Sequence, residues 1–292
     1  MNEWGIILDS SCGYTRDEMR LKNIGFVPFK IRYGKDEFDD GINIFTDDIA
    51  KKARLLQVAK TSVPSLTIIE DEYDKMLQNY ENLIVVPLSR NLSGMNNAMR
   101  LVAQEEKYNG KVYVLESNLF GNWIEFLVPR LIKWRDNNHP LKEVIKIIEN
   151  YNESTFASVM IDDLQFLSAG GRISQSQARI GSLAGVKPVL VIRDGKIDEN
   201  ESYKTRNTKK ALDKICNVIN DYIEDNSIKP SDYYLQIPYI GESEDYANVK
   251  KIVKSKIKGF ELNEEIKGTP KSIVLVYTGV NTTGIGLVKK ID

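Results

Sequence analysis

The chain has 292 residues, and its 40 lysines and arginines against 41 aspartates and glutamates leave a net charge of −1. This balance excludes an overall basic field of the kind that attracts nucleic acid or a charged membrane surface. No apolar run approaches the ~18 residues of a membrane span, and the start lacks the basic region of a signal peptide, so we expect a cytoplasmic protein.

Strands that alternate with helices are predicted through the first half of the chain. Nearly continuous apolar runs at 4–8, 83–86 and 112–115 are typical of strands buried on both faces of a sheet. Helical spacing is found at 46–58, 66–79, 93–108, 119–136 and 141–151. This alternation predicts a parallel sheet covered by helices, an α/β/α sandwich.

A polar stretch at 150–154 marks a change of rhythm and a candidate domain boundary. Beyond it, Asp194-Gly195 between two β-rich runs is a strong hairpin signal. Strands are expected at 156–161, 189–192, 196–198, 233–237 and 272–277, with helices at 208–224 and 243–258. We therefore predict an α/β protein with an N-terminal domain at 1–153, an α+β domain at 154–292, and a ligand between them.

Two hydroxyl clusters stand out in the first domain, Thr61-Ser62-Val63-Pro64-Ser65 and the segment from Ser89 to Gly94. The single histidine, His139, lies in a polar, turn-like stretch, so it is expected in a solvated loop and not beside a nucleophile. Hydroxyl donors near a helix N-terminus can replace the hydration of a buried carboxylate. The clusters therefore indicate anion binding.

Ser93 has two compatible roles in this interpretation. It stands where the helix at 93–108 would begin, so its hydroxyl can cap that helix and also face an anion. Thr61 and Ser62 come shortly before Pro64, which disfavours a helical residue ahead of it. Their side chains are therefore expected on an extended loop.

Metal and nucleotide chemistry find little support in the sequence. Cys12 and Cys216 are far apart and give neither metal-ligand nor disulfide spacing, so both are expected to be free thiols. Nucleotide binding in the parallel-sheet domain is an alternative, but the chain lacks a Walker sequence. Gly284-x-Gly286 also lies too near the C-terminus to open a helix between two strands. We expect no metal and no cofactor.

Several short motifs, in their order and spacing, resemble the DegV family of bacterial fatty-acid-binding proteins. They are Asp9-Ser10-Ser11-Cys12, Val27-Pro28-Phe29, Asp40-Gly41, Thr61-Ser62-x-Pro64-Ser65, Leu92-Ser93-Gly94, Leu167-x-x-Gly170-Gly171-Arg172-Ile173, Lys187-Pro188, Asp194-Gly195 and Lys204-x-Arg206. The resemblance implies a lipid-binding protein, not itself an enzyme, that buries a long-chain fatty acid. It would present the carboxylate to a separate fatty acid kinase for acyl-phosphate formation.

The resemblance also implies which residues bind the carboxylate. It assigns this role to Thr61 and Ser93, with Ser62 and Gly94 beside them. It also places the stretch around Arg172 next to the site, so we expect this cation near the head group or its phosphorylated form.

Tyr277 departs from the family pattern, because a histidine usually stands there. A tyrosine hydroxyl can donate a hydrogen bond to a carboxylate, but it cannot become cationic. Met95 and Val63 also replace a common threonine and a frequent glutamine. These differences leave open another lipid or a small anion as the ligand.

Candidates for the acyl-chain pocket and for partner docking come from the second domain. Residues with helical or near-helical spacing are Phe166, Ile173, Ile180 and Leu183, a pattern that plain core residues also show. Lys204 and Arg206 begin a basic cluster that ends at Lys210. This cluster is either a solvated helix start or, as the resemblance implies, a surface for the kinase or for transient membrane contact.

A serine hydrolase of acyl esters is the alternative from another functional class. Ser93 would be its nucleophile, with a lysine as the base. No Ser-His-Asp set can be assembled from the sequence, which argues against this alternative.

Overall fold

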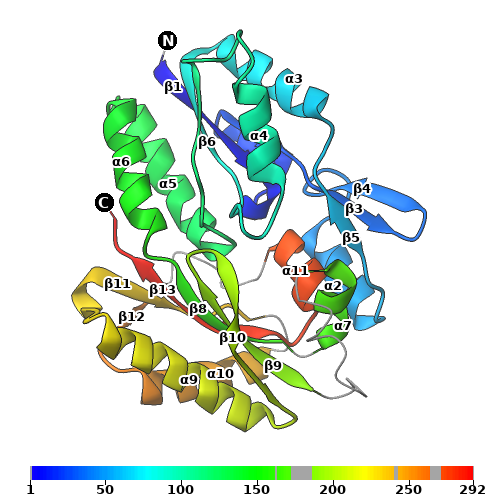
Figure 1. The fold of residues 1–292 in the computed structure, drawn as a ribbon, viewed down its shortest axis with the longest axis vertical. Coiled ribbons are helices and arrows are strands. Elements are labelled where there is room, and N and C mark those ends of the chain that lie inside the picture. The colour runs from blue at the N-terminus through cyan, green and yellow to red at the C-terminus, as the bar shows by residue number, and fades with distance from the viewer. Residues whose placement is uncertain (1, 162, 172–185, 240–242, 264–270, 292) are drawn as a thin grey trace.

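A parallel four-stranded sheet forms the first half of the molecule. The computed structural model describes residues 2–161, 163–171, 186–239, 243–263 and 271–291. The strands of this sheet lie in the order β2 (Ile24–Val27), β1 (Asn2–Asp9), β6 (Tyr80–Val86), β7 (Val112–Val114). All its pairings are parallel, which confirms the α/β prediction (Figure 1).

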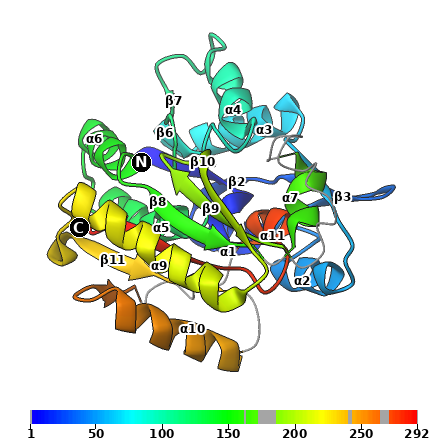
Figure 2. The same ribbon diagram turned by 60° about the horizontal axis from the view of Figure 1, so that its bottom comes forward.

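Helices cover both faces of this sheet. In chain order they are η1 (Ser10–Cys12), α1 (Arg16–Leu21), α3 (Leu66–Leu77), α4 (Met95–Ala103), α5 (Asn122–Asp136) and α6 (Leu141–Asn152). Figure 2 shows α3 and α4 on one side of the sheet and α5 on the other. His139 is exposed in the turn between α5 and α6, and Cys12 and Cys216 are buried free thiols, as predicted.

A small antiparallel sheet, absent from the sequence prediction, follows the first strands. Its order is β4 (Asp36–Asp39), β3 (Lys30–Tyr33), β5 (Lys60–Ser62). It packs with α2 (Thr46–Arg54) and α11 (Ser272–Thr278) around a core that includes Ile31, Ile49 and Leu275. Thr61 and Ser62 therefore lie on a strand and not on a loop.

The segment 272–277 was predicted as a strand, and that prediction was wrong. Its Ile-Val-Leu-Val run has high β-propensity, but the segment forms α11, which packs against α2 and α7 (Leu164–Gly170). Burial of Leu275 and Val276 in the small core outweighs the modest helix cost of β-branched residues. The predicted helices at 46–58 and 93–108 were also too long, because α2 ends at Arg54 and α4 at Ala103.

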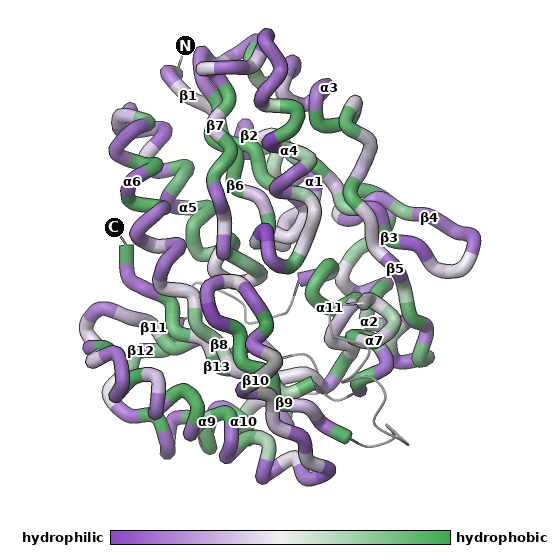
Figure 3. Tube along the Cα trace, in the orientation of Figure 1, coloured by the Kyte–Doolittle hydropathy of each residue, from purple (hydrophilic) through white to green (hydrophobic). Residues whose placement is uncertain are grey.

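A second sheet of six strands forms most of the other half. Its order is β10 (Lys196–Thr205), β9 (Lys187–Arg193), β8 (Phe156–Met160), β13 (Thr283–Lys289), β11 (Tyr233–Gln236), β12 (Glu261–Leu262). The short helix η2 (Pro230–Asp232) and the longer α9 (Thr208–Asp225) and α10 (Ser243–Lys256) accompany it. Figure 3 shows hydrophobic and hydrophilic stretches alternating along α9, as expected of a helix with one buried face. No strand was predicted at the position of β13.

The β9–β10 turn joins the two halves of the molecule. Asp194 and Gly195 have φ angles of +50° and +66°, so the predicted tight hairpin is confirmed. The Ser89 hydroxyl donates a hydrogen bond to the Gly195 carbonyl oxygen over 2.8 Å. A Cβ atom at Gly195 would lie 2.3 Å from the Asn118 carbonyl oxygen, so only glycine fits at this contact.

Along the ranges described above, no helix combines the length and the apolarity needed to cross a bilayer.

Candidate functional site

A cavity of about 140 Å³ lies over the face of the six-stranded sheet. Strands β8, β9 and β10 form its floor, the loops after β6 and before α5 form its roof, and α11 forms one wall. Lining side chains that represent these parts are Val159, Leu190, Ile192, Leu88, Leu92 and Val274. The lining is mostly apolar, so this space suits a hydrocarbon chain better than a polar metabolite.

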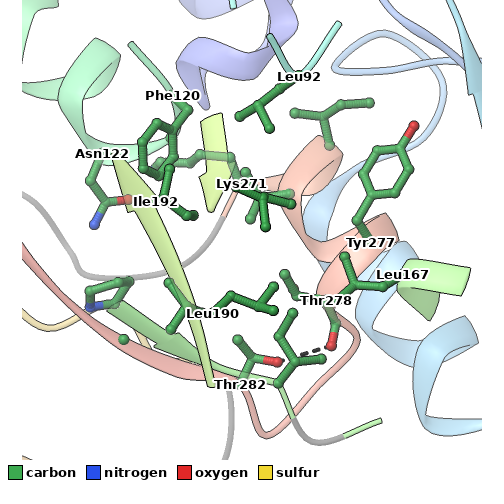
Figure 4. Close-up of a pocket in the computed structure, with 18 of the residues that line it drawn as sticks. Leu92, Phe120, Asn122, Leu167, Leu190, Ile192, Lys271, Tyr277, Thr278 and Thr282 are labelled. Carbon is green, nitrogen blue, oxygen red and sulfur yellow. Dashed lines mark hydrogen bonds between the residues drawn. The ribbon is translucent and has the colours of Figure 1, made fainter. Parts of the chain in front are cut away.

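Tyr277 brings a hydroxyl to one edge of the cavity. Figure 4 shows its ring at this edge, with Asn122 at the opposite edge. The Tyr277 hydroxyl hydrogen-bonds with the Thr61 hydroxyl, which links α11 to β5. The ring packs against Gly170, where a Cβ atom would lie 2.2 Å from Tyr277 Cδ1. Two residues 216 positions apart thus form a pair of hydroxyls at the end of an apolar space.

The second hydroxyl cluster lies beside the first. A Cβ atom at Gly94 would be 3.9 Å from Val63 Cγ1, so the segment after Thr61 and the start of α4 are in contact distance. The Ser93 Oγ accepts a hydrogen bond from the Met95 backbone N–H over 3.1 Å. The predicted helix start at Ser93 was wrong by two residues, because Gly94 is the cap and α4 begins at Met95.

A buried carboxylate holds the loop that carries Ser93. Asp9, 1% exposed, accepts hydrogen bonds from the Leu88 N–H over 2.6 Å, from the Ser11 N–H over 2.9 Å and from the Ser11 hydroxyl. Burial raises the pKa of Asp9 to about 6, although these hydrogen bonds oppose the shift. Asp9 therefore fixes where the chain leaves β6 and enters the hydroxyl loop.

A second buried carboxylate holds the start of α11. Asp40 accepts hydrogen bonds from the Ser10 hydroxyl over 2.6 Å and from the Ser272 hydroxyl over 2.5 Å. Burial raises the pKa of Asp40 to about 6 as well, against these hydrogen bonds and with a smaller contribution from Asp9. Because α11 carries Tyr277, Asp40 anchors the helix that supplies one of the two site hydroxyls.

The far edge of the cavity holds an ion pair. Lys271 Nζ lies 2.8 Å from Glu125 Oε2, and the two side chains are only 8% and 13% exposed. Asn122, the first residue of α5, is 5% exposed and lines the cavity together with Lys271. Neither Lys271 nor Glu125 was singled out from the sequence, and a pairing across 146 positions leaves no local sequence signal.

The other predicted site residues occupy varied positions. Ser62 is exposed on β5, and Phe166 packs against Gly279, where a Cβ atom would lie 2.6 Å from Phe166 Cδ2. Its neighbour Leu167 lines the cavity instead. The predictions at Arg172, Ile173, Ile180 and Leu183 lie outside the described residues.

The basic residues singled out for docking lie at the end of β10. Lys204 is half-buried there, and Arg206 is exposed just before α9. Within the described ranges, no group of three or more histidine, cysteine, aspartate or glutamate side chains is arranged to hold a metal ion.

Comparison with known proteins identifies the family. Residues 3–290 match the family described as "Uncharacterised protein, DegV family". The chain belongs to the DegV family. A DegV domain-containing protein from Clostridium perfringens is 30% identical over 230 residues, which cover 77% of this chain and 79% of that protein. A DegV domain-containing protein from Staphylococcus aureus is 22% identical and covers 98% of both chains.

Solved structures of DegV proteins share the fold. A stearic-acid-binding protein from Eubacterium ventriosum superposes with a TM-score of 0.81 at 20% identity, and the match covers 98% of each chain. A DegV family protein from Thermus thermophilus, described for its fatty acid binding, gives a TM-score of 0.78 at 21% identity. That match covers 99% of this chain and 100% of the other.

Proposed function

We propose that this protein encloses a long-chain fatty acid and presents its carboxylate to a separate fatty acid kinase, which forms the acyl phosphate. The observation that carries the proposal is an apolar cavity that ends at the hydroxyl pair of Thr61 and Tyr277. The structurally similar proteins from Eubacterium ventriosum and Thermus thermophilus, described as binding stearic acid and fatty acid, support it. The units 1–153 and 154–292 would serve as the head-group domain and the tail-covering domain.

The two ends of the ligand would be bound by different forces. Burial of each methylene contributes about 0.8 kcal/mol, so a long tail supplies on the order of 10 kcal/mol before entropic losses. The carboxylate would accept hydrogen bonds from the hydroxyls of Thr61, Ser93 and Tyr277. The backbone at Gly94 and the hydroxyl of Ser62 would flank this position. Arg172 would supply a positive charge to the carboxylate.

We assign the protein no catalytic step of its own. The Ser93 Oγ accepts a hydrogen bond from the Met95 N–H, which is the geometry of a turn just before α4 and not of a nucleophile paired with a base. His139 is exposed in the α5–α6 turn and cannot serve Ser93 as a base from there. These positions favour a carrier over a serine hydrolase.

Native mass spectrometry of the purified protein, followed by denaturation and identification of the released molecule, tests the proposal. We expect one fatty acid per chain. A Val274→Trp variant should lose the lipid, because the indole would fill the cavity, whereas Tyr113→Trp, at an exposed position of β7, should keep it. A protein that carries no lipid after incubation with a panel of fatty acids would refute the proposal.

The kinase would dock on the basic cluster at Lys204 and Arg206, because both residues are positively charged and Arg206 is exposed to solvent. Reversal of the charge in Arg206→Glu should weaken kinase binding several-fold and leave the bound lipid unchanged. Lys133→Glu, on the exposed side of α5, is the matched control and should have no effect. Loss of lipid in Arg206→Glu would instead indicate a folding defect and remove this assignment.

A further inference from the structure

The turn after α2 exposes three apolar side chains to solvent. Leu55, Leu56 and Val58, here called the α2 tip, are 72%, 62% and 40% exposed. Figure 1 shows α2 and the following strand β5 at the edge of the molecule, and Figure 2 shows α2 at the edge from a second side. Single exposed leucines are ordinary on protein surfaces, but three such side chains within four residues form a patch that calls for an explanation.

The backbone of Leu56 shows that folding does not explain the tip. Leu56 has a φ of +55°, a conformation that helix ends usually assign to glycine because a side chain there is strained. Its N–H donates to the Ala53 carbonyl over 2.9 Å, which closes the last turn of α2. A leucine at this position adds strain and gains little burial, so its side chain serves something other than the core.

The charges of the chain segment that contains the tip have one sign. Between Ile49 and Ile69 the chain contains four cations and no carboxylate, as the sequence shows: Lys51, Lys52, Arg54 and Lys60. The acids of α2, Asp47 and Asp48, lie in its first turn, at the opposite end of the helix. Arg32 of β3 faces Lys60 of β5 on one side and Glu37 of β4 on the other, so the cations that border the tip are those of α2 and β5. Exposed leucines are therefore bordered by lysines and arginines.

We propose that the α2 tip docks on the surface of an anionic lipid bilayer. Leu55, Leu56 and Val58 insert among the acyl chains near the interface, and the flanking cations contact the anionic head groups. This arrangement matches the two layers of a membrane surface, an apolar interior beneath a negatively charged plane. Lys51 and Arg54 keep their charges at that plane while their alkyl stems follow the apolar side chains.

Docking at this tip would place the bilayer close to the site hydroxyls. Val58 precedes Thr61 by three residues, and β5 begins at Lys60, so roughly 10 Å of extended chain separates the membrane from the head-group position. This consequence rests on the proposed function. A fatty acid that leaves the bilayer here would meet the hydroxyl pair with its carboxylate first.

Vesicle flotation tests the docking. The wild-type protein should float with vesicles made of about two parts phosphatidylcholine to one part phosphatidylglycerol. Salt at about 0.5 M should release the protein, because it screens the charges. The double variant Leu55→Gln with Leu56→Gly should bind these vesicles roughly tenfold or more weakly. It should be at least as stable to heat as the wild type, because glycine removes the strain at position 56. Lys51→Gln with Arg54→Gln should weaken binding several-fold.

Leu101→Gln is the matched control, because Leu101 is 55% exposed on α4, away from the tip. It should bind vesicles like the wild type. The proposal is overturned if the wild type does not float, if the double variant floats equally well, or if Leu101→Gln loses as much. It is equally overturned if the tip mutations abolish a concentration-dependent dimer and leave vesicle binding unchanged.

Lipid content separates this proposal from the proposed function. The bound fatty acid, measured by mass spectrometry after denaturation, should be the same in the wild type and the double variant. Loss of docking with no change in lipid content would be the expected effect of the tip mutations. A protein that docks on vesicles but never contains a fatty acid would refute the carrier function and leave the docking surface in place.

Discussion

The carboxyl edge of the four-stranded sheet and the face of the six-stranded sheet meet at one cavity, but they are built by different means. At the edge, Asp9 and Asp40 each accept directed hydrogen bonds from neighbouring groups. Across from it, the floor consists of apolar side chains such as Leu190 and Ile192, whose contacts have no preferred direction. One region fixes positions, and the other supplies an apolar surface.

This difference predicts how each region responds to change. A hydrogen-bonded network in a buried site has one good arrangement, so removal of one member leaves others unsatisfied. An apolar floor tolerates exchanges of similar volume. We therefore expect the head-group end to set where the ligand begins and the floor to set which tails fit.

The largest effect is expected from Asp9→Ala. The change leaves the Leu88 N–H and both donors of Ser11 without their acceptor in a buried place. We expect a loss of about 3 kcal/mol or more in the free energy of unfolding, measured by urea denaturation. Asp71→Ala, at an exposed position of α3, should change it by less than about 0.5 kcal/mol. Equal effects in the two variants would show that the edge is not a cooperative network.

The pH dependence of Asp40 gives the next effect. Because burial raises its pKa from 3.8 to about 6, the folded state keeps a proton between about pH 4 and 6 that the unfolded state releases. This contribution to stability is present below pH 4 and is lost as the pH rises through 6. Relative to Asp40→Asn, the wild type should lose about 1 to 3 kcal/mol between pH 4 and pH 7. A constant difference between the two proteins across urea titrations at these pH values would contradict the shift.

The smallest effect is expected from Tyr277→Phe. The variant keeps the ring that packs against Gly170 and loses only the hydroxyl that bonds to Thr61. Affinity for a fatty acid, measured by isothermal titration of delipidated protein, should fall roughly fivefold. Tyr113→Phe, which removes an exposed hydroxyl far from the cavity lining, is the control. Unchanged affinity in Tyr277→Phe would rule out the hydroxyl as a donor to the carboxylate.

Much of the fold followed from local patterns in the sequence. The buried strands β1 and β6 are nearly continuous apolar runs. Asp194-Gly195 is a residue pair that two-residue hairpin turns prefer, because both residues must adopt a positive φ angle. The strand prediction for 272–277 was wrong because the packing of α11 against α2 and α7 outweighs the β-propensity of the segment. The strands β3, β4 and β5 are too short and too polar to stand out.

The site was predictable only in its local parts. The hydroxyl clusters at Thr61 and Ser93 are visible in the sequence, and the structure brings their segments together. The hydrogen bond between Asp40 and Ser272 joins residues 232 positions apart, so the sequence near one residue does not indicate the other. Long-range partners of this kind arise from topology, which short sequence windows do not contain.

The contact at Gly195 has a consequence for how sequences of this fold can diverge. The backbone of the turn lies against the Asn118 carbonyl and the Ser89 hydroxyl, so the main chain and one small side chain set the spacing of the two halves there. Side chains elsewhere on either sheet can then be exchanged without altering that spacing. We therefore expect related proteins to keep the width of the cavity through this contact while the side chains that line it change with the ligand.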